Sequence, residues 1–214
     1  KNNIVSSKTG EDYGIRFSFA NTNADGKMPG SWRNKNNFKL TGNATLVEGL
    51  KINANINYHN QHTKGRPQIG YGANSVGQDM FQWGQRQLDY ERLEDYQTND
   101  GDQRTWNRIS YANGDPRYAD NPYWTAYENY PEDQRRRIFG SLGVSYQLNE
   151  NLTAEGNIYG DAYTFTTEER IAINSQAQPY YEETVRNRSE FNYEGRLNYS
   201  QDFGDITLSG VAGG

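Results

Sequence analysis

The chain has 214 residues and a formal charge of -5, with 33% hydrophobic residues and a mean hydropathy of -1.07. This composition is too polar for an ordinary α/β enzyme core, whereas its 14% of aromatic residues is too high for a disordered chain. The absence of cysteine excludes a disulfide scaffold, a zinc ribbon and a cysteine nucleophile, and no continuous apolar stretch approaches the roughly 18 residues of a membrane-spanning helix.

The first five residues, Lys1 to Val5, lack the apolar core of a signal peptide. We therefore expect the chain to follow a removed signal or to begin inside a longer protein. Strands that cross a membrane remain compatible with the low hydropathy, because a barrel strand turns apolar side chains outward only at every second position.

Seven segments alternate apolar and polar residues with a period of two, which predicts β-strands with one apolar and one polar face. In the third segment, for example, Ile52, Ile56 and Tyr58 alternate with asparagines. Glutamate and arginine within the alternation indicate that the second face meets water or a polar lumen. The predicted strands lie near residues 11–20, 36–46, 50–60, 136–147, 151–165, 188–201 and 204–213.

The connections between these strands alternate between short and long. Short turns are expected at 47–49, 148–150 and 202–203, and long connections at 21–35, 61–134 and 164–187. All six prolines and all four tryptophans fall in the long connections, as expected when a closed hydrogen-bond ladder excludes proline. Short turns at one end and long loops at the other are typical of outer-membrane barrels, whereas soluble sandwiches have loops of mixed length and Greek-key order.

Aromatic residues near the predicted strand ends fit the interfacial girdles of a barrel. Ordinary cross-strand packing explains each of them about equally well. These residues are Tyr58, Tyr146, Tyr199 and Phe203.

Residues 61–134 differ from the rest of the chain in charge and in aromatic content. They contain seven Lys and Arg against twelve Asp and Glu, a net of -5, while the other 140 residues hold fifteen of each sign. They also hold twelve of the 29 aromatic residues, so we expect this loop to fold. Phe81 and Leu88 lie one heptad apart with Trp83 and Tyr90 nearby, which predicts a short helix near 77–96.

Two groups of polar residues match fragments of metal sites. His59 and His62 are the only histidines and, without cysteine, fit surface positions better than a metal site. The stretch 99–102, Asn-Asp-Gly-Asp, resembles part of a calcium loop but lacks the closing glutamate, and a polar turn is the simpler interpretation. We expect no bound metal.

Enzyme activity is not expected either. Glu91, Glu94 and Asp95 could be paired acids for glycoside cleavage, yet a solvated helix face explains them more simply. The sequence contains no Ser-His-Asp set, phosphate-binding loop or HExxH motif, and no cofactor is indicated.

The best candidates for ligand contact are four aromatic residues of the long loop, because flat rings stack on sugars and cover much area with little loss of rotamer freedom. The alternative is that these rings build the core of the loop itself, which is favoured for the last of them. The acidic loop suits neutral glycans or basic peptides and disfavours nucleic acid. The candidates are Trp83, Trp106, Tyr123 and Trp124.

Five short motifs, in order along the chain, resemble the SusC-like (SusC/RagA) TonB-dependent outer-membrane transporters of Bacteroidetes. The longest is Asp-Asn-Pro-Tyr-Trp at 120–124, followed by Tyr-Glu-Asn at 127–129 and by two arginines at 135–136. The others are Arg-Phe-Ser-Phe at 16–19 leading to 26–29 and 36–38, Lys-Gly-Arg-Pro at 64–67, Phe-Gln-Trp-Gly-Gln at 81–85 and Glu-Arg-Ile-Ala at 169–172.

This resemblance implies a plug domain followed by a barrel of about 22 strands. It also implies import of glycan or peptide oligomers across the cell outer membrane, with outer-membrane lipid around the barrel and with a SusD-like surface lipoprotein and TonB as partners. We therefore expect residues 1–214 to be an all-β barrel segment without a plug. Its fold should be a partial antiparallel up-and-down transmembrane barrel with long extracellular loops, one of them containing a short helix.

Two other functions stay open from the sequence. One is a soluble carbohydrate-binding β-sandwich, in which exposed Trp and Tyr would form the binding platform. The other is an outer-membrane barrel of a secretion or adhesion system, which would have no SusD-like partner. The residues leave open the identity of the substrate, the oligomeric state, and whether the long loop contacts the substrate or the lipoprotein.

Overall fold

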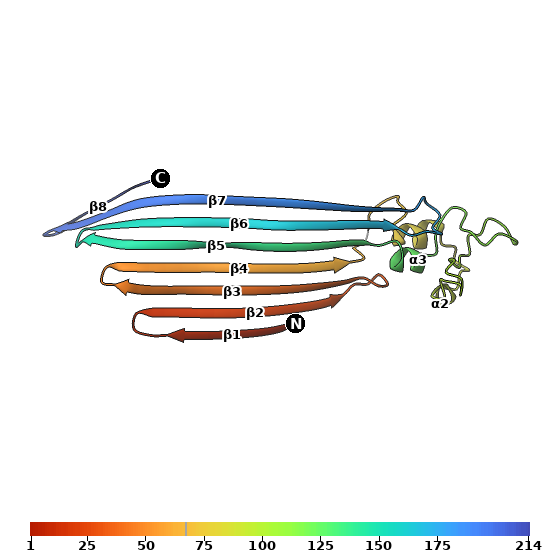
Figure 1. Cartoon of the computed structure of the whole chain (residues 1–214), viewed down its shortest axis with the longest axis horizontal. Coiled ribbons are helices and arrows are strands. Elements are labelled where there is room, and N and C mark those ends of the chain that lie inside the picture. Colours follow the sequence, from red (N-terminus) through yellow and green to blue (C-terminus); the bar gives the residue numbers. More distant parts are fainter. Residues whose placement is uncertain (67) are drawn as a thin grey trace.

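The computed structural model describes residues 1–66 and 68–214. Its eight strands form one antiparallel sheet in which each strand pairs with its neighbours in the sequence. Figure 1 shows the meander, with short turns at one end and the long loops gathered at the other. The strands are β1 (Asn2–Thr9), β2 (Tyr13–Asp25), β3 (Trp32–Val47), β4 (Leu50–Lys64), β5 (Pro131–Asn149), β6 (Leu152–Ile171), β7 (Tyr180–Phe203) and β8 (Ile206–Gly213).

The predicted all-β, up-and-down architecture is confirmed, with eight strands instead of about seven. Strand β1 was not predicted, because its sequence is polar apart from Ile4 and Val5. It forms through backbone pairing along the whole length of the strand, from Asn2 opposite Asn21 to Thr9 opposite Gly14.

The connections at the end with the long loops are shorter than predicted, because the strands continue beyond the alternating segments. The connection expected at 21–35 covers only 26–31 in the structure. The one expected at 61–134 covers 65–130, and the one expected at 164–187 covers 172–179. Trp32 and Pro131 therefore lie in strands and not in loops, each as the first residue, where proline is tolerated. Pro67 lies outside the described residues.

The opposite end has the tight turns, at 10–12, 48–49, 150–151 and 204–205. The predicted turn at 202–203 is wrong, because Asp202 and Phe203 pair with Thr207 and Ile206 in the β7–β8 ladder. Gly204, with φ of 67°, makes the bend two residues later, in a left-handed conformation that glycine adopts at low cost.

The strand register places the apolar side chains of the alternating segments on one face of the sheet. Across one row, Phe17 pairs with Leu40 and Leu40 pairs with Ile56, and the row continues through Gly140 and Gly160. The next row runs from Ser18 through Lys39, Asn57 and Phe139 to Asp161 and Glu190, and it is polar except for Phe139. Side chains of directly paired residues point to the same face, so the sheet has one apolar and one polar surface.

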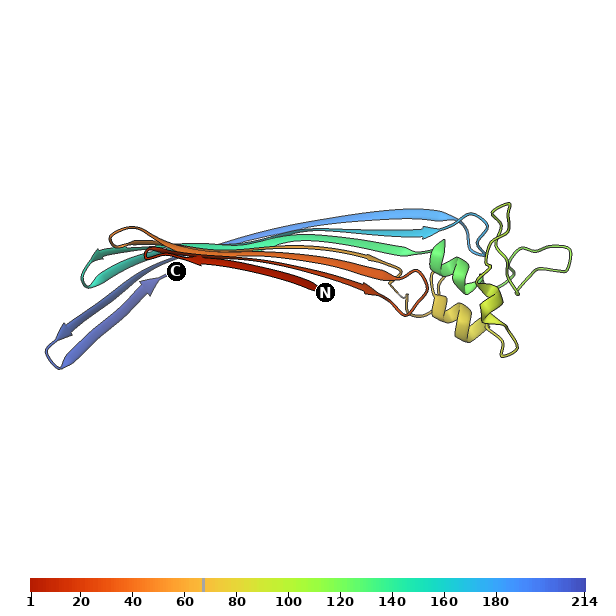
Figure 2. The ribbon, with the colours of Figure 1, turned by 90° about the horizontal axis from the view of Figure 1, so that it is seen from below.

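No second layer covers the apolar face within residues 1–66 and 68–214. Ile56 is 38% exposed and Leu142 is 54% exposed, although each lies in the middle of a strand. Figure 2 shows the sheet edge-on as a single curved layer with the helices and loops at one end. All five buried hydrophobic residues lie outside the middle of the sheet, at Ala119, Trp124, Ala126, Ile171 and Ala172.

The predicted helix at 77–96 is interrupted. Short turns α1 (Val76–Gln78) and η1 (Asp79–Trp83) end at Gly84, whose backbone is extended, and α2 (Tyr90–Leu93) begins six residues later. The Tyr90 hydroxyl donates to the Met80 carbonyl at 2.9 Å, and a Cβ at Gly84 would lie 2.1 Å from both groups. The chain therefore folds back at Gly84 to close this contact.

A further short helix, α3 (Pro122–Tyr127), forms from the Asn-Pro-Tyr-Trp motif. No helix in the described part of the chain combines the length and the apolarity that crossing a membrane requires.

Candidate functional site

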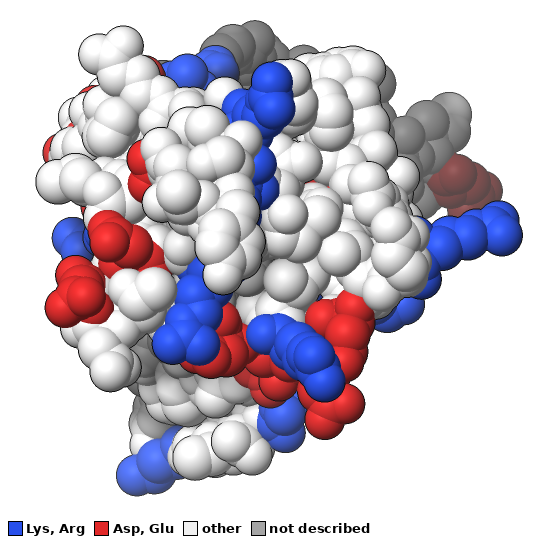
Figure 3. All heavy atoms as spheres, turned by 90° about the vertical axis from the view of Figure 1, so that its right-hand side faces the viewer, with Lys and Arg blue, Asp and Glu red and all other residues white. Residues whose placement is uncertain are grey.

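Residues 65–130, together with the loop 172–179, form a folded unit at one end of the sheet, which we call the cap. Figure 3 views the molecule from this end and shows acidic and basic side chains lying next to one another, with large uncharged areas between them. Arg66 joins the cap to β5, because its guanidinium donates to both carboxylate oxygens of Asp133, at 2.9 and 3.1 Å.

Asn121 is the centre of the cap and is completely buried. Its side-chain oxygen caps α3 by accepting from the backbone N–H of Tyr123 at 2.9 Å. Its amide nitrogen donates to the carbonyls of Leu93 and Arg104, at 2.9 and 2.7 Å. Proline follows at the first helical position, where no backbone N–H is needed. One asparagine therefore fixes α3 against two other segments of the loop.

Asp120 and Asn129 connect the two parts of the cap. Asp120 accepts from the Gln103 amide at 2.7 Å, from the backbone N–H of Gln176 at 2.6 Å and from the Asn129 amide at 3.2 Å. The Asn129 oxygen accepts from the backbone N–H of Ala172 at 2.7 Å. The loop backbone lies outside the β-sheet, so its buried polar groups need other hydrogen-bond partners, and these side chains supply them.

A second buried carboxyl group, that of Asp79, accepts fewer hydrogen bonds than Asp120 does. It is 7% exposed and accepts one hydrogen bond from a neighbouring side chain, the Thr125 hydroxyl, at 2.7 Å. Loss of solvation raises its pKa from 3.8 to about 7, and the nearby Asp120 carboxylate adds to that rise, while the bond from Thr125 opposes it. Burial also raises the pKa of Asp120.

The four aromatic residues predicted to contact a ligand do not form one cluster. Trp124 is 2% exposed, and its indole N–H donates to the Ser175 hydroxyl at 2.9 Å, which makes it part of the cap core. Trp83 stacks on Tyr118 with ring centroids 5.8 Å apart. Trp106 is half-buried, and its indole nitrogen is enclosed without a hydrogen-bond partner among the described residues. Ligand contact by any of the four stays a prediction.

Tyr123 lines an open hollow of about 530 Å³ at the edge of the cap. It stacks on Tyr127 with ring centroids 6.5 Å apart, and Tyr127 stacks on Tyr96 at 5.4 Å. The Tyr123 hydroxyl donates to Glu94 at 3.3 Å, and Pro29 completes the lining. The hollow thus presents three tyrosine rings, a surface suited to stacking on a sugar or on a peptide side chain.

Tyr96 and Tyr127 were absent from the predicted set. Tyr127 could have been found, because it follows Tyr123 by four residues and so shares its helix face. Tyr96 comes close only through the fold of the loop.

The other residues considered for chemistry take structural roles. His62 contacts Glu132 across the β4–β5 ladder, and no group of three or more His, Asp or Glu is placed to hold a metal in the described ranges. The stretch 99–102 is a turn closed by a 2.8 Å bond from the Thr98 N–H to the Asp102 carbonyl. Glu94 and Asp95 have separate partners, Tyr123 and Arg104.

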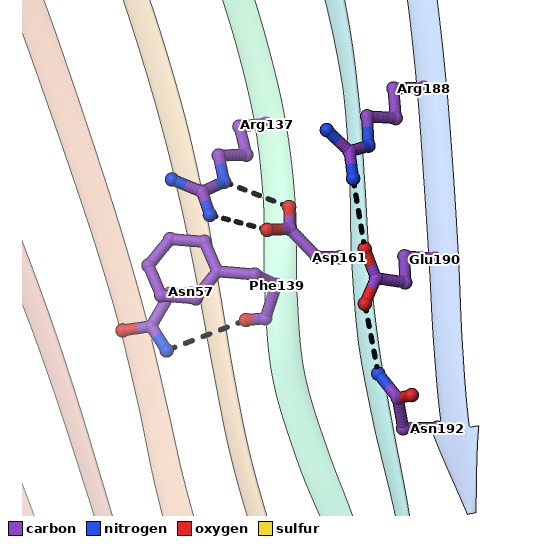
Figure 4. Close-up of polar contacts among 7 residues, drawn as sticks. All are labelled: Asn57, Arg137, Phe139, Asp161, Arg188, Glu190 and Asn192. Atoms are coloured by element: carbon purple, nitrogen blue, oxygen red, sulfur yellow. Dashed lines mark hydrogen bonds and ion pairs between the residues drawn. The ribbon is translucent and has the colours of Figure 1, made fainter.

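The polar face of the sheet carries an ordered set of ion pairs and amides (Figure 4). Arg137 on β5 donates through both its Nε and a terminal nitrogen to Asp161 on β6, with the Nε bond at 2.8 Å. On β7, Arg188 and Asn192 both donate to Glu190, at 3.2 and 3.3 Å. The alternation in the sequence predicted that this face is polar and meets water. It did not predict which residues pair on it, because that depends on the strand register.

Comparisons with known proteins support this fold. No family model matches the sequence, and no curated protein matches it. Among solved structures, the chain is similar to the RagAB peptide importer in its closed-closed state, with a TM-score of 0.67 and 14% identity. A weaker likeness, with a TM-score of 0.43 and 10% identity, is to the ferric-catecholate import receptor Fiu of E. coli K12 in its open form.

The likeness to the peptide importer covers 99% of this chain but only 23% of that one, so the chain spans about a quarter of the structure it matches. Against the Fiu receptor the covered shares are 96% and 30%. At this level of identity the match shows the fold alone, which is part of an antiparallel up-and-down barrel wall with a folded cap at one end.

Replacing Asn121 with alanine should loosen the cap selectively. The change removes the helix cap and leaves the carbonyls of Leu93 and Arg104 without this donor, which together should cost about 2–4 kcal/mol. We expect faster native-state hydrogen exchange of backbone amides in 90–130, with the amides of 138–146 unchanged. Asn99→Ala, in the exposed turn 99–102 and without a side-chain hydrogen bond to any described residue, is the matched control and should change little. Uniform acceleration in cap and strands alike would contradict the role of Asn121.

Cap stability should depend on pH through Asp79. Its pKa is higher in the folded cap, at about 7, than the 3.8 of an unfolded chain, so the folded state holds an extra proton between these values. Stability should therefore fall as pH rises from about 4 to about 7 and then level off. Asp79→Asn should flatten this slope, measured by hydrogen exchange corrected for intrinsic rates. An unchanged slope in the variant would assign the effect to other groups.

Proposed function

We propose that the chain is part of the barrel wall of an outer-membrane, TonB-dependent importer of the SusC-like kind. The observation that carries this proposal is the sheet with one uncovered apolar face, one polar face and a folded cap at one end. In this arrangement the apolar face contacts lipid, the polar face lines the lumen and the cap lies outside the cell.

The dimensions of the apolar face support this placement. On β4 the apolar positions run from Leu50 to Tyr58, nine residues, which matches the roughly 9–11 residues of a spanning strand. Beyond Tyr58 the same face becomes polar, with Asn60 paired to Arg136. The face is also hollowed to about 850 Å³ over small residues such as Gly42 and Ala54, a shape that acyl chains would fill.

Aromatic rings lie at both limits of this band, as interfacial girdles require. At the cap side, Phe19, Phe38 and Tyr58 form a row with ring centroids 4.6 and 6.1 Å apart. At the turn side, Tyr146 is 47% exposed and Phe203 is 55% exposed.

For the transported material we propose an oligomer, either a glycan or a peptide, taken up with a SusD-like surface lipoprotein and with energy from TonB. The similar solved structure is a peptide importer, and the five motifs point to the same kind of transporter. The hollow of Tyr96, Tyr123 and Tyr127 is the place where the cap would contact the oligomer or the lipoprotein. A soluble sugar-binding sandwich is disfavoured, because the described strands form one sheet and not two.

Placing arginine on the apolar face tests the membrane assignment. Ile56→Arg puts a charge near the middle of the band and should cost about 2–4 kcal/mol, seen as less heat-resistant barrel in outer membranes. Asn55→Arg, on the opposite face between Thr41 and Ser141, is the matched control and should assemble normally. Equal assembly of both variants would count against a lipid-facing surface.

Purification of the natural-length protein tests the importer class. The proposal expects a detergent-dependent complex containing a surface lipoprotein. A folded protein that stays monodisperse without detergent would overturn the barrel, and a detergent-dependent barrel without a lipoprotein would favour a secretion or adhesion system.

A further inference from the structure

Five cations gather on the polar face of the sheet, in two adjacent rows on the cap side of its middle. The first row runs across β3 to β7 as Lys35, Gln61, Arg135, Phe165 and Arg186. The second row, next toward the turns, runs as Asn37, His59, Arg137, Tyr163 and Arg188. We call these ten residues the basic belt.

The belt contains no acidic residue, although the chain as a whole has a charge of -5. Acidic residues occur in the flanking rows, at Asp133 on the cap side and at Asp161 and Glu190 on the turn side. Positive charge is therefore concentrated in one band of the wall.

Two of the five cations are neutralised by these neighbours. Arg137 pairs with Asp161 and Arg188 pairs with Glu190, so both point toward the turn side, as Figure 4 shows. Lys35, Arg135 and Arg186 form no ion pair with any residue that the structure describes. All three belong to the row nearer the cap.

The unpaired cations are spaced regularly, and one of them is held by a neighbouring ring. Arg135 lies over the Tyr163 ring at 4.7 Å, which orders its guanidinium without removing its charge. Lys35, Arg135 and Arg186 occupy every second strand, so their backbones are about 9.6 Å apart, two interstrand spacings. An extended ligand lying across the strands would meet a positive charge at regular intervals.

On β3 and β4 the belt carries amide and imidazole groups beside its cations, whereas on β6 the rings of Phe165 and Tyr163 separate the arginines of β5 and β7. Asn37, Gln61 and His59 can each donate and accept hydrogen bonds, which suits the many hydroxyl groups of a sugar chain. An acidic peptide would use the cations but offers few hydroxyls to the amides. The combination favours a ligand that is both anionic and rich in hydroxyl groups.

We propose that the basic belt binds an anionic oligosaccharide, bearing carboxylate or sulfate groups, as it passes through the lumen. This inference rests on the proposed function, because only the barrel placement turns the polar face toward a transported oligomer. The belt is separated from the cap by the row of Asp133, so an incoming chain would reach the belt after passing the cap and that row.

The test uses the natural-length protein in detergent and measures binding of oligogalacturonate, of its fully methyl-esterified form, and of a sulfated oligogalactan. Arg135→Gln with Arg186→Gln should weaken binding of an anionic oligomer by about tenfold or more, because hydrogen bonds to charged groups are lost. The double variant should also reduce the salt dependence of binding. Binding of the neutral ester should be weak and unchanged.

Arg136→Gln is the matched control, since Arg136 adjoins Arg135 on the same strand but faces the other side of the sheet. It should bind as the unmodified protein does. The carboxylate and sulfate arms identify which anion is preferred, and failure of both oligomers to bind would overturn the proposal. Unchanged affinity in the double variant would overturn it as well.

Two further outcomes separate this inference from the proposed function. If oligoglutamate binds more tightly than either oligosaccharide with the same dependence on Arg135 and Arg186, the belt binds acidic peptides and the glycan assignment is wrong. If cells import neutral oligomers through the protein but the anionic ones do not bind, the importer stands and the belt assignment fails. Belt-dependent binding without any import would support the belt and contradict the importer.

Discussion

The structure depends on one constraint, the strict alternation of apolar and polar side chains in strands that are locked in register. A shift of β4 by one residue against β3 would bring Asn57, in place of Ile56, opposite Leu40 and turn every apolar side chain to the other face. The paired rows repeat this pattern from β2 to β7, so the apolar and polar surfaces are continuous. A single sheet cannot bury such an apolar face by itself, and this is why the environment of the sheet, more than its own packing, has to stabilise it.

The cap is stabilised differently, because its long loop folds without the hydrogen-bond ladder of paired strands. Its core is small and largely polar, with Asn121, Asn129 and Thr125 among the most deeply buried side chains. These groups replace strand pairing by satisfying backbone carbonyls and N–H groups one at a time. In this core the carboxyl group of Asp79 lowers the stability at neutral pH, because its pKa is raised by burial.

The strands could be predicted from the sequence wherever apolar and polar side chains alternate along them. The middles of β2 to β7 could be predicted because their two faces meet different surroundings. The same rule fails at the strand ends: beyond Tyr58 and Ile138 both faces are polar, so the alternation vanishes while the ladder continues to Lys64 and back to Pro131. Strand β1 was missed for this reason. The helix near 77–96 was predicted as continuous because the helical spacing of Phe81 and Leu88 does not show the contact between Tyr90 and Met80.

The candidate site was less accessible from sequence, because its parts meet only in the folded chain. Tyr96 joins Tyr127 over a gap of 31 positions, and the basic belt combines residues from β3, β5 and β7. The aromatic content of the loop indicated that it folds, and Trp124 is central to its core. Some aromatic rings are buried in the core of the cap and others stay exposed to a ligand. Tertiary packing decides between these two positions, and residue type alone does not predict it.

Spin labels placed one at a time on β5 at 138, 139, 141, 142 and 144 would test the central claim most directly, since these 214 residues contain no native cysteine to interfere. With the natural-length protein in lipid bilayers, collision with oxygen should be highest at Ile138, Leu142 and Val144, and collision with a water-soluble nickel complex highest at Phe139 and Ser141. This period of two is the result that a lipid-facing apolar surface predicts. Equal access of the nickel complex to both sets of positions would contradict it.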